Sequence, residues 1–308
     1  MPPSPTAGEI PSPLAGSLNI LNTVDATAPG AHAMTDATTA LLEFIHQHPR
    51  LLVLTGAGIS TDSGIPDYRD QLGQWKRPQP VQHPDFMGCE HTRKRYWGRS
   101  LVGWPVMRDA RPNPAHSALA TLERLGHVSL LVTQNVDGLH QRAGSEKVVD
   151  LHGRSDQVVC MRCDYRYSRD DTHQRSAELN PEFIHYTAAT APDGDADLEV
   201  DFSRFHVPEC DRCGGILKPD VVFFGDNVPR QRVADSLNAL EAADGLLVIG
   251  SSLMVYSGFR FCRKAQEWNK PIAALTLGKT RADELLSLKL NAPITPLLQG
   301  VLNGLAAE

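Results

Sequence analysis

A glycine-rich turn after a short apolar stretch is the part of the sequence most able to do chemistry. Residues 51–69 read LLVLTGAGISTDSGIPDYR, so a buried-strand pattern runs directly into Gly56, Gly58 and Gly64. A strand, a glycine turn and a helix in that order present backbone N–H groups to a phosphate. Thr61 stands where G-x-G-x-x-G has its third glycine, so we expect a dinucleotide but not an ordinary hydride-transfer enzyme. The alternative is a tight turn that binds nothing.

Polar side chains follow two further predicted strands. The strand at 128–133 ends in Gln134, Asn135 and Asp137, and a later short strand leads to His152. In a doubly wound sheet, ligands lie beyond the carboxyl ends of the strands, where these side chains can bond ribose hydroxyls and a carboxamide. An imidazole, with an ordinary pKa of about 6.5, suits proton abstraction near neutrality. Asn and Asp also favour turns, and a single His is more often structural; their convergence on one glycine turn favours a functional site.

Two C-x-x-C pairs, Cys160 with Cys163 and Cys210 with Cys213, predict a metal site. Each pair places two thiolates on a tight turn, and two pairs together form a tetrahedral zinc site. Four thiolates leave no open position for water, so the zinc would be structural. Two disulfides or free thiols are the alternative, but a chain without an export signal favours thiols and metal.

An acidic run lies between the two cysteine pairs. Asp193, Asp195 and Asp197 alternate as in a calcium loop, but Leu198 and Arg204 stand where such a loop needs Gly and Glu. We therefore expect a solvated loop.

Length and composition limit the possible classes of protein. The chain of 308 residues predicts one large domain and a smaller one. A net charge of −6 and a pI near 6.1 argue against nucleic-acid binding. No apolar run approaches the roughly 20 residues that span a bilayer, so we expect no membrane partner. The first 49 residues lack Lys and Arg, which argues against signal and transit peptides and favours a cytoplasmic protein.

The remaining pattern alternates strands with helices and predicts a mainly parallel, doubly wound α/β fold. Strands are expected at 51–55, 128–133, 148–150, 220–224, 246–249 and 272–276, and helices at 37–47, 230–243 and 258–269. A further helix should begin at Pro114 with Asn113 as its N-cap and end before Gly126. Thr280 and Asp283 resemble the capping box of a last helix.

Taken together, these segments resemble the sirtuin family of NAD-dependent protein deacylases. The resemblance covers about 35–305 and rests on GAGIS at 56–60, GIPDYR at 64–69, TQNVDGLH at 133–140, LHG at 151–153, the four cysteines, VVFFGD at 221–226 and GSSL at 250–253. Segments at 95–105, 141–145, 250–261 and 278–289 are most similar to class II sirtuins. The resemblance implies removal of an acyl group from a protein lysine, with release of nicotinamide and O-acyl-ADP-ribose, and a structural Zn²⁺. Acyl-lysine proteins would be the partners, and a monomer is favoured.

Composition and the positions of these segments predict a division of the chain. Residues 1–34 would be a disordered tail. Residues 35–67, 113–155 and 219–308 would form a Rossmann-like NAD-binding domain, with a helical insertion at 68–112 and a zinc-binding module at 156–218.

Roles for individual residues follow from the same resemblance. The NAD contacts would come from Gly56, Ala57, Gly58, Ser60, Ile65, Asp67, Tyr68, Arg69, Gln134, Asn135, Asp137, Gly250, Ser251, Ser252, Thr276 and Gly278. Thr276 stands where the family usually has an asparagine for the adenosine ribose. His152 would be the general base, with Asn135 and Asp137 beside it in the catalytic set. Val221, Phe224 and Gly225 on one side, and Leu253 and Val255 on the other, would sandwich the substrate peptide.

The acyl preference is less determined. Tyr96 and Arg99 form a Y-x-x-R pair like the one that reads acidic acyl groups in desuccinylating sirtuins. The alternative is that both residues pack and solvate a helix of the insertion.

Three other functions are compatible with parts of the pattern. A mono-ADP-ribosyltransferase would use the same NAD site. A hydride-transfer enzyme is disfavoured because no strand ends in an acidic residue about 20 positions past the glycines. A zinc-dependent peptide binder would have no need of His152, Asn135 and Asp137 together.

Overall fold

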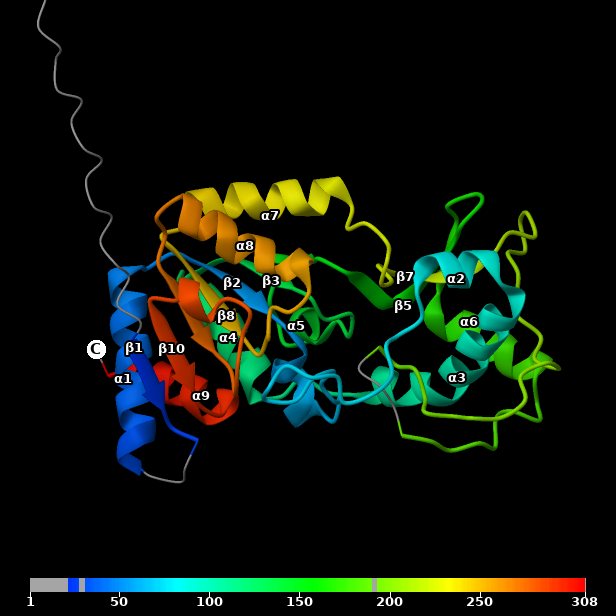
Figure 1. Cartoon of the computed structure of the whole chain (residues 1–308), viewed down its shortest axis with the longest axis horizontal. Helices are drawn as coiled ribbons and strands as arrows, with labels where there is room; N and C mark the ends of the chain where they lie inside the picture. The colour runs from blue at the N-terminus through cyan, green and yellow to red at the C-terminus, as the bar shows by residue number, and fades with distance from the viewer. Residues whose placement is uncertain (1–21, 28–30, 190–192, 308) are drawn as a thin grey trace, which may run out of the picture.

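Two lobes of unequal size make up the protein in a computed structural model that describes residues 22–27, 31–189 and 193–307 (Figure 1). The large lobe is built on a parallel sheet of seven described strands in the order β1-β10-β9-β8-β2-β3-β4. These strands are β1 (Asn22–Asp25), β2 (Leu51–Thr55), β3 (Val128–Thr133), β4 (Val148–Asp150), β8 (Gly245–Ile249), β9 (Ile272–Leu275) and β10 (Leu288–Asn291). The predicted doubly wound sheet is confirmed.

Helices cover both faces of the large sheet because its strands are apolar on both sides. Along β2, Leu51 and Val53 pack with the helices of one face, and Leu52 and Leu54 with those of the other. The first face carries α1 (Ala31–Gln47), α4 (Pro114–Arg124) and α9 (Ile294–Leu305). The second face carries α7 (Arg230–Ala242) and α8 (Tyr256–Glu267). The two short helical turns η1 (Ala57–Ser63) and α5 (Leu139–Arg142) follow β2 and β3.

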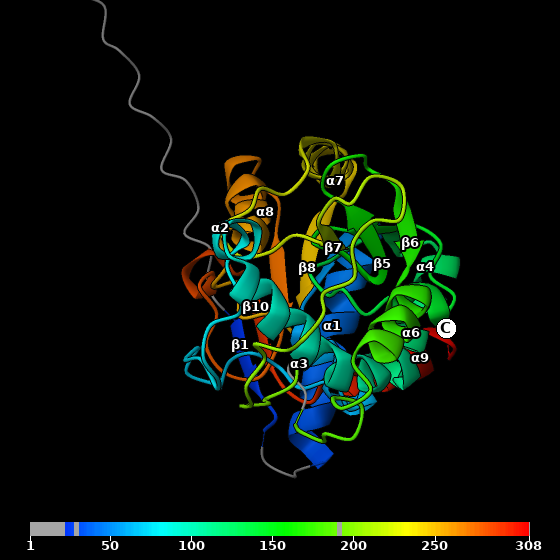
Figure 2. The same cartoon turned by 90° about the vertical axis from the view of Figure 1, so that its right-hand side faces the viewer.

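The small lobe joins the two predicted insertions around one core (Figure 2). Its antiparallel sheet has the order β6-β5-β7, from β5 (Gly153–Cys160), β6 (Arg166–Ser168) and β7 (Leu217–Val221). Its helices are α2 (His83–Gly88), α3 (Glu90–Asp109) and α6 (Arg169–Leu179). Phe86 and Trp97 from the helical segment share a core with Val158, Phe205 and Leu217 from the cysteine-bearing segment. The two insertions therefore form a single unit.

Two predicted boundaries are wrong at the start and in the middle of the chain. Part of the expected tail is structured: residues 22–25 form β1 beside β10, and 31–34 begin α1, whereas residues 1–21 lie outside the described part. The strand expected at 220–224 is β7, which begins and ends three residues earlier, and it belongs to the small sheet because it pairs with β5.

The predicted last helix is also misplaced. Thr280 N–H donates to the Asp283 carboxylate at 3.2 Å, as in a capping box, but only the 3-10 turn η2 (Asp283–Leu285) follows. The chain then enters β10, and the last described helix is α9. Asp283 also accepts a hydrogen bond from Lys289 of β10, so its carboxylate contacts the strand that follows.

The N-cap of α4 ties that helix to the glycine turn. Asn113 Oδ1 accepts the backbone N–H groups of Ala115 at 2.9 Å and His116 at 3.3 Å, as the sequence predicts. Its Nδ2 donates to the Ile59 carbonyl at 2.7 Å. Asn113 is buried, so removing its side chain would leave all these backbone groups without a partner and without access to water.

We therefore expect Asn113→Ala to lower the free energy of unfolding by about 1–3 kcal/mol, measured by urea titration. Ser117→Ala, at an exposed position of the same helix, is the matched control and should change stability by less than about 0.5 kcal/mol. Equal effects of the two substitutions would show that the cap does not stabilise the turn.

Candidate active site

A cavity of about 550 Å³ lies at the carboxyl ends of the parallel strands and reaches the small lobe. This is the position in which open α/β sheets bind ligands. The predicted residues that border it are Gly56, Ala57, Gly58, Ser60, Ile65, Asp67, Tyr68, Arg69, Gln134, Asn135, Asp137, His152, Val221, Phe224, Gly225, Gly250, Ser251, Ser252, Leu253, Val255 and Thr276. Segments far apart in the sequence thus meet at one site.

Three predicted ligand residues do not border the cavity. Tyr96 and Arg99 lie on α3, outside its lining. Gly278 has a φ of +82°, and a Cβ there would approach the Gln71 carbonyl oxygen to 2.2 Å. Gly278 therefore allows two loops beside the site to pack closely.

The glycines of the first turn pack against a second loop. Gly58 N–H donates to the Gly250 carbonyl at 2.8 Å, so it is already paired within the protein. A Cβ on Gly58 would come within 2.9 Å of Gly250, and one on Gly250, whose φ is +64°, within 2.5 Å of the Ile59 nitrogen. The close approach that requires these glycines is between the loops after β2 and β8.

A polar network joins the turn to the end of β3. Ser60 Oγ donates to Asp137 Oδ2 at 2.8 Å, and Asn135 Nδ2 donates to Ser60 Oγ at 3.1 Å and to the Gly56 carbonyl at 3.2 Å. Burial raises the pKa of Asp137, while hydrogen bonds from Leu139 N–H and Ser60 act in the opposite direction. The network fixes the Asn135 and Asp137 side chains at the cavity wall.

His152 is a neutral imidazole with a defined tautomer. Its Nδ1 lies 2.9 Å from the Gln134 carbonyl, which can only accept, so Nδ1 carries the proton. Its Nε2 is then the acceptor, and Ser257 Oγ donates to it at 2.8 Å. Burial lowers the pKa of His152 to about 4, although the bond to the Gln134 carbonyl opposes that shift. A lone pair at the cavity is thus available near neutral pH.

Sequence reasoning missed several lining residues, among them Ser257, Arg260, Trp75 and Asp193. Ser257 and Arg260 lie on the first turns of α8, where the sequence has no separate catalytic signal. Asp193 comes from the small lobe, and only the tertiary structure brings that segment to the cavity.

Aromatic side chains form the wall nearest the small lobe. Trp75 contacts Tyr68 and Phe224 edge-to-face, with ring centroids 6.0 and 5.7 Å away. The Arg69 guanidinium lies 3.9 Å from the Trp75 ring centroid, and its NH1 donates to the Gly73 carbonyl. Tyr68 and Arg69, both predicted to contact NAD, are therefore held in an aromatic cluster.

The four cysteines of the two C-x-x-C motifs converge in the small lobe. Their sulfurs all lie within 4.8 Å of one another, with Cys160 and Cys213 3.5 Å apart and Cys163 and Cys210 3.7 Å apart. A tetrahedral zinc with bonds of 2.3 Å would place sulfurs about 3.8 Å apart. A Cβ at Gly215 would come within 2.8 Å of Cys160 Sγ, so the turn needs glycine there. These four cysteines are not in disulfides, and their arrangement fits a structural zinc.

A family model described as "Sir2 family" matches residues 56–257. The chain belongs to the Sir2 family. Among relatives, an "NAD-dependent protein deacetylase" of Xanthomonas campestris pv. campestris is 60% identical, over 83% of this chain and 88% of the relative. The "NAD-dependent protein lipoamidase sirtuin-4, mitochondrial" of Bos taurus is 49% identical, over 84% and 83%. The class II assignment stays a prediction.

Solved Sir2 structures share the fold of this sirtuin. A Sir2 structure with a p53 peptide and NAD⁺ superposes with a TM-score of 0.72 at 30% identity, covering 88% of this chain and 99% of that chain. One with an acetylated peptide has a TM-score of 0.71 at 29% identity, with the same coverage. Within the described residues, no helix has the length and apolar character needed to cross a membrane.

Metal removal should unfold the small lobe of this sirtuin first. Cys213→Ser should lose about one zinc per chain by elemental analysis, because three thiolates and a hydroxyl bind the ion more weakly. The small lobe should then unfold at lower urea than in the parent protein. Cys262→Ser, at a buried thiol outside the cluster, is the control and should keep its zinc. Full zinc content in Cys213→Ser would contradict the site.

The imidazole at the cavity should also affect stability. Because the pKa of His152 is lower in the folded protein than the ordinary 6.5, the unfolded chain binds more protons between pH 6.5 and about 4. His152 therefore makes the free energy of unfolding fall as the pH falls through this window.

We expect His152→Gln to reduce the slope of stability against pH between 6 and 5, by up to about 1.4 kcal/mol per unit. Urea titrations at several pH values measure this slope. Comparison with the parent protein cancels opposite contributions, such as that of Asp195, whose pKa is raised to about 7. An unchanged slope would mean that His152 is not buried as a neutral group.

Proposed function

We propose that this sirtuin removes acyl groups from protein lysines in an NAD-dependent reaction that releases nicotinamide and O-acyl-ADP-ribose. The observation that carries the proposal is a partly buried neutral imidazole at a cavity bordered by two close-packed glycine loops and by a strand-like segment from the small lobe. The names of the relatives and the ligands of the solved neighbours support it.

NAD would lie along the carboxyl ends of the strands. Loop residues Ala57, Ser251 and Ser252, with Thr276, suit its phosphates and adenosine ribose. The nicotinamide side would meet Ile65, Asp67 and Asp137, which border the same cavity. NAD supplies an N-glycosidic bond whose cleavage releases nicotinamide and leaves a sugar able to accept the acyl group.

His152 would act as the general base. Its Nε2 holds a lone pair that now accepts from Ser257 Oγ, and a ribose hydroxyl could take that position. Nδ1 keeps its proton and donates it to the Gln134 carbonyl, which keeps the ring oriented. A pKa of about 4 in the free protein leaves the base deprotonated at neutral pH.

The peptide would bind as an added strand. Residues 222–225 follow β7, and Val222 N–H donates to the His152 carbonyl at 2.8 Å. Leu253 to Val255 line the cavity opposite them. Main-chain bonds on both sides would draw an acyl-lysine toward His152 and tolerate varied sequences. We also place the enzyme in the cytoplasm, where its free thiols would persist.

The test is nicotinamide release from NAD with an acetyl-lysine peptide, followed by mass spectrometry of the products. The parent protein should give deacetylated peptide and O-acetyl-ADP-ribose. His152→Ala should reduce the rate roughly 10²–10⁴-fold, because the base is lost. His185→Ala, at an exposed position of the small lobe, should leave it unchanged.

Two outcomes would count against the proposal. A full rate in His152→Ala would remove the base from its role. A protein carrying ADP-ribose, without free lysine, would instead favour the mono-ADP-ribosyltransferase.

A further inference from the structure

An acidic segment of the small lobe, residues 193–199, reaches the cavity. It contains Asp193, Asp195, Asp197 and Glu199 and was expected to be a solvated loop. That expectation is wrong for its first half, because the Asp195 side chain is only 13% exposed and Asp193 lines the cavity.

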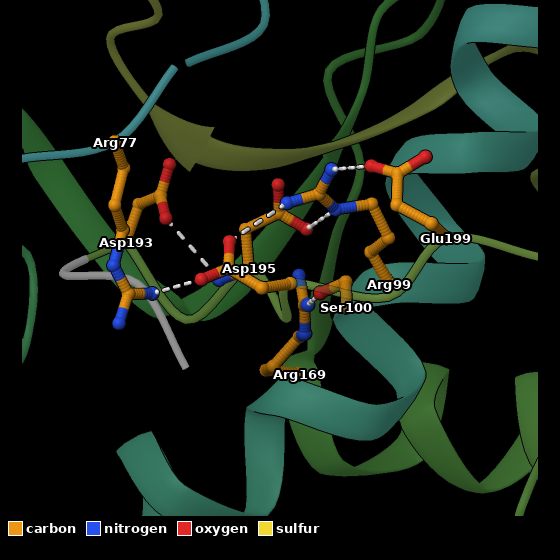
Figure 3. A network of polar contacts seen from close by, with 8 residues as sticks. Arg77, Arg99, Ser100, Arg169, Asp193, Asp195 and Glu199 are labelled. Atoms are coloured by element: carbon orange, nitrogen blue, oxygen red, sulfur yellow. Dashed lines mark hydrogen bonds and ion pairs between the residues drawn. The ribbon is translucent and has the colours of Figure 1, made fainter. Parts of the chain in front are cut away.

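The arginine expected to read acidic acyl groups is already paired with this segment. Arg99 Nε lies 3.1 Å from Asp195, NH2 lies 3.4 Å from Asp197 and NH1 lies 3.5 Å from Glu199. Arg77 NH1 lies 2.8 Å from Asp197. Figure 3 shows that Arg169, a third guanidinium nearby, bonds Ser100 instead. Each nitrogen of Arg99 therefore faces a carboxylate of the protein.

The acidic segment is held in place by packing. Ala196 and Leu198 are buried in the core of the small lobe. Gly103 of α3 lies directly beneath the segment, since a Cβ there would come within 2.2 Å of the Gly194 carbonyl oxygen. Displacing the carboxylates from Arg99 would thus disturb buried contacts as well as ion pairs.

Asp193 brings negative charge to the aromatic wall of the cavity. Burial raises the pKa of Tyr68, and the Asp193 charge adds to that shift. Burial also raises the pKa of Asp193 itself, and burial with the Asp193 charge raises that of Asp195 to about 7. Asp193 Oδ1 accepts the Asp195 backbone N–H at 3.2 Å. This end of the cavity is an environment in which carboxylates are already costly to ionise.

We propose that the acidic segment sets the acyl preference, so that the enzyme rejects acyl groups ending in a carboxylate and accepts neutral ones. This inference rests on the proposed deacylase function. An acyl carboxylate at the aromatic wall would meet Asp193, while Arg99 is already paired with carboxylates and Arg69 is stacked on Trp75 and bonded to the Gly73 carbonyl. Like charges in a desolvated site repel strongly. Repulsion by Asp193, and not attraction by Arg99, then determines which acyl groups the enzyme accepts.

The experiment compares one peptide carrying acetyl-, butyryl-, succinyl- or glutaryl-lysine. In the parent protein, kcat/KM for the two acidic groups should be at least about 100-fold below that for acetyl, the cost of one unpaired buried charge. Asp193→Asn should raise the succinyl-to-acetyl ratio about 10-fold or more. Asp195→Asn removes the carboxylate that pairs with Arg99 Nε, so it should raise the succinyl-to-acetyl ratio as well. This variant replaces Asp193→Asn as the test if Asp193→Asn is unstable.

Asp201→Asn is the matched control. Asp201 lies in the same part of the chain but is exposed and bonds only its near neighbour Ser203 in the described contacts, so the ratio should not change. Arg99→Met should not lower succinyl activity selectively. Near-equal activity of the parent protein on succinyl and acetyl peptides would overturn the inference, as would an unchanged ratio in both Asp variants.

Peptide binding, measured by calorimetry in the absence of NAD, separates this inference from the proposed function. If no peptide is turned over, the deacylase proposal fails. Tighter binding of the succinyl peptide to Asp193→Asn than to the parent protein would still support the acidic segment as the device that rejects carboxylates. Equal binding would refute it.

Discussion

The close contact between the loops after β2 and β8 is the constraint on which the site depends. Gly58 and Gly250 approach until no Cβ fits between them, and a backbone hydrogen bond of 2.8 Å joins them. This contact brings the ends of adjacent parallel strands together, so Ser251 can accept a bond from Gln134 at 2.8 Å. Gln134 in turn orients His152 through its carbonyl. The Gln134 carbonyl thus determines the tautomer of the imidazole, and the Gln134 side chain is bonded to the loop after β8.

The small lobe completes the site from the other side. Its core joins residues from the helical segment and the cysteine-bearing segment, and a zinc on four thiolates would fasten the turns at its far end. β7 leaves this lobe and continues beside His152, where Gly153 has a φ of +84° and no room for a Cβ. The wall that faces a substrate is therefore positioned by the lobe that would bind the metal.

Several elements could be predicted because their signals are local. The strand at Leu51–Thr55, the Asn113 cap and the C-x-x-C pairs each depend on neighbours within a few residues, and the structure has all of them. β1 was missed because four mostly exposed residues have no hydrophobic period. β7 was assigned to the wrong sheet because an apolar run does not show which strand it pairs with.

The sequence by itself determined the family, the alternation of strands and helices, the four sulfur ligands and most residues that border the cavity, since spacing along the chain encodes these features. The tertiary structure decided what those residues can still do. Gly58 N–H pairs with another loop, Arg99 is surrounded by carboxylates, and Asp193 reaches the cavity from a segment that reads as solvated. The availability of a group depends on partners distant in sequence, and only the folded chain brings those partners into contact.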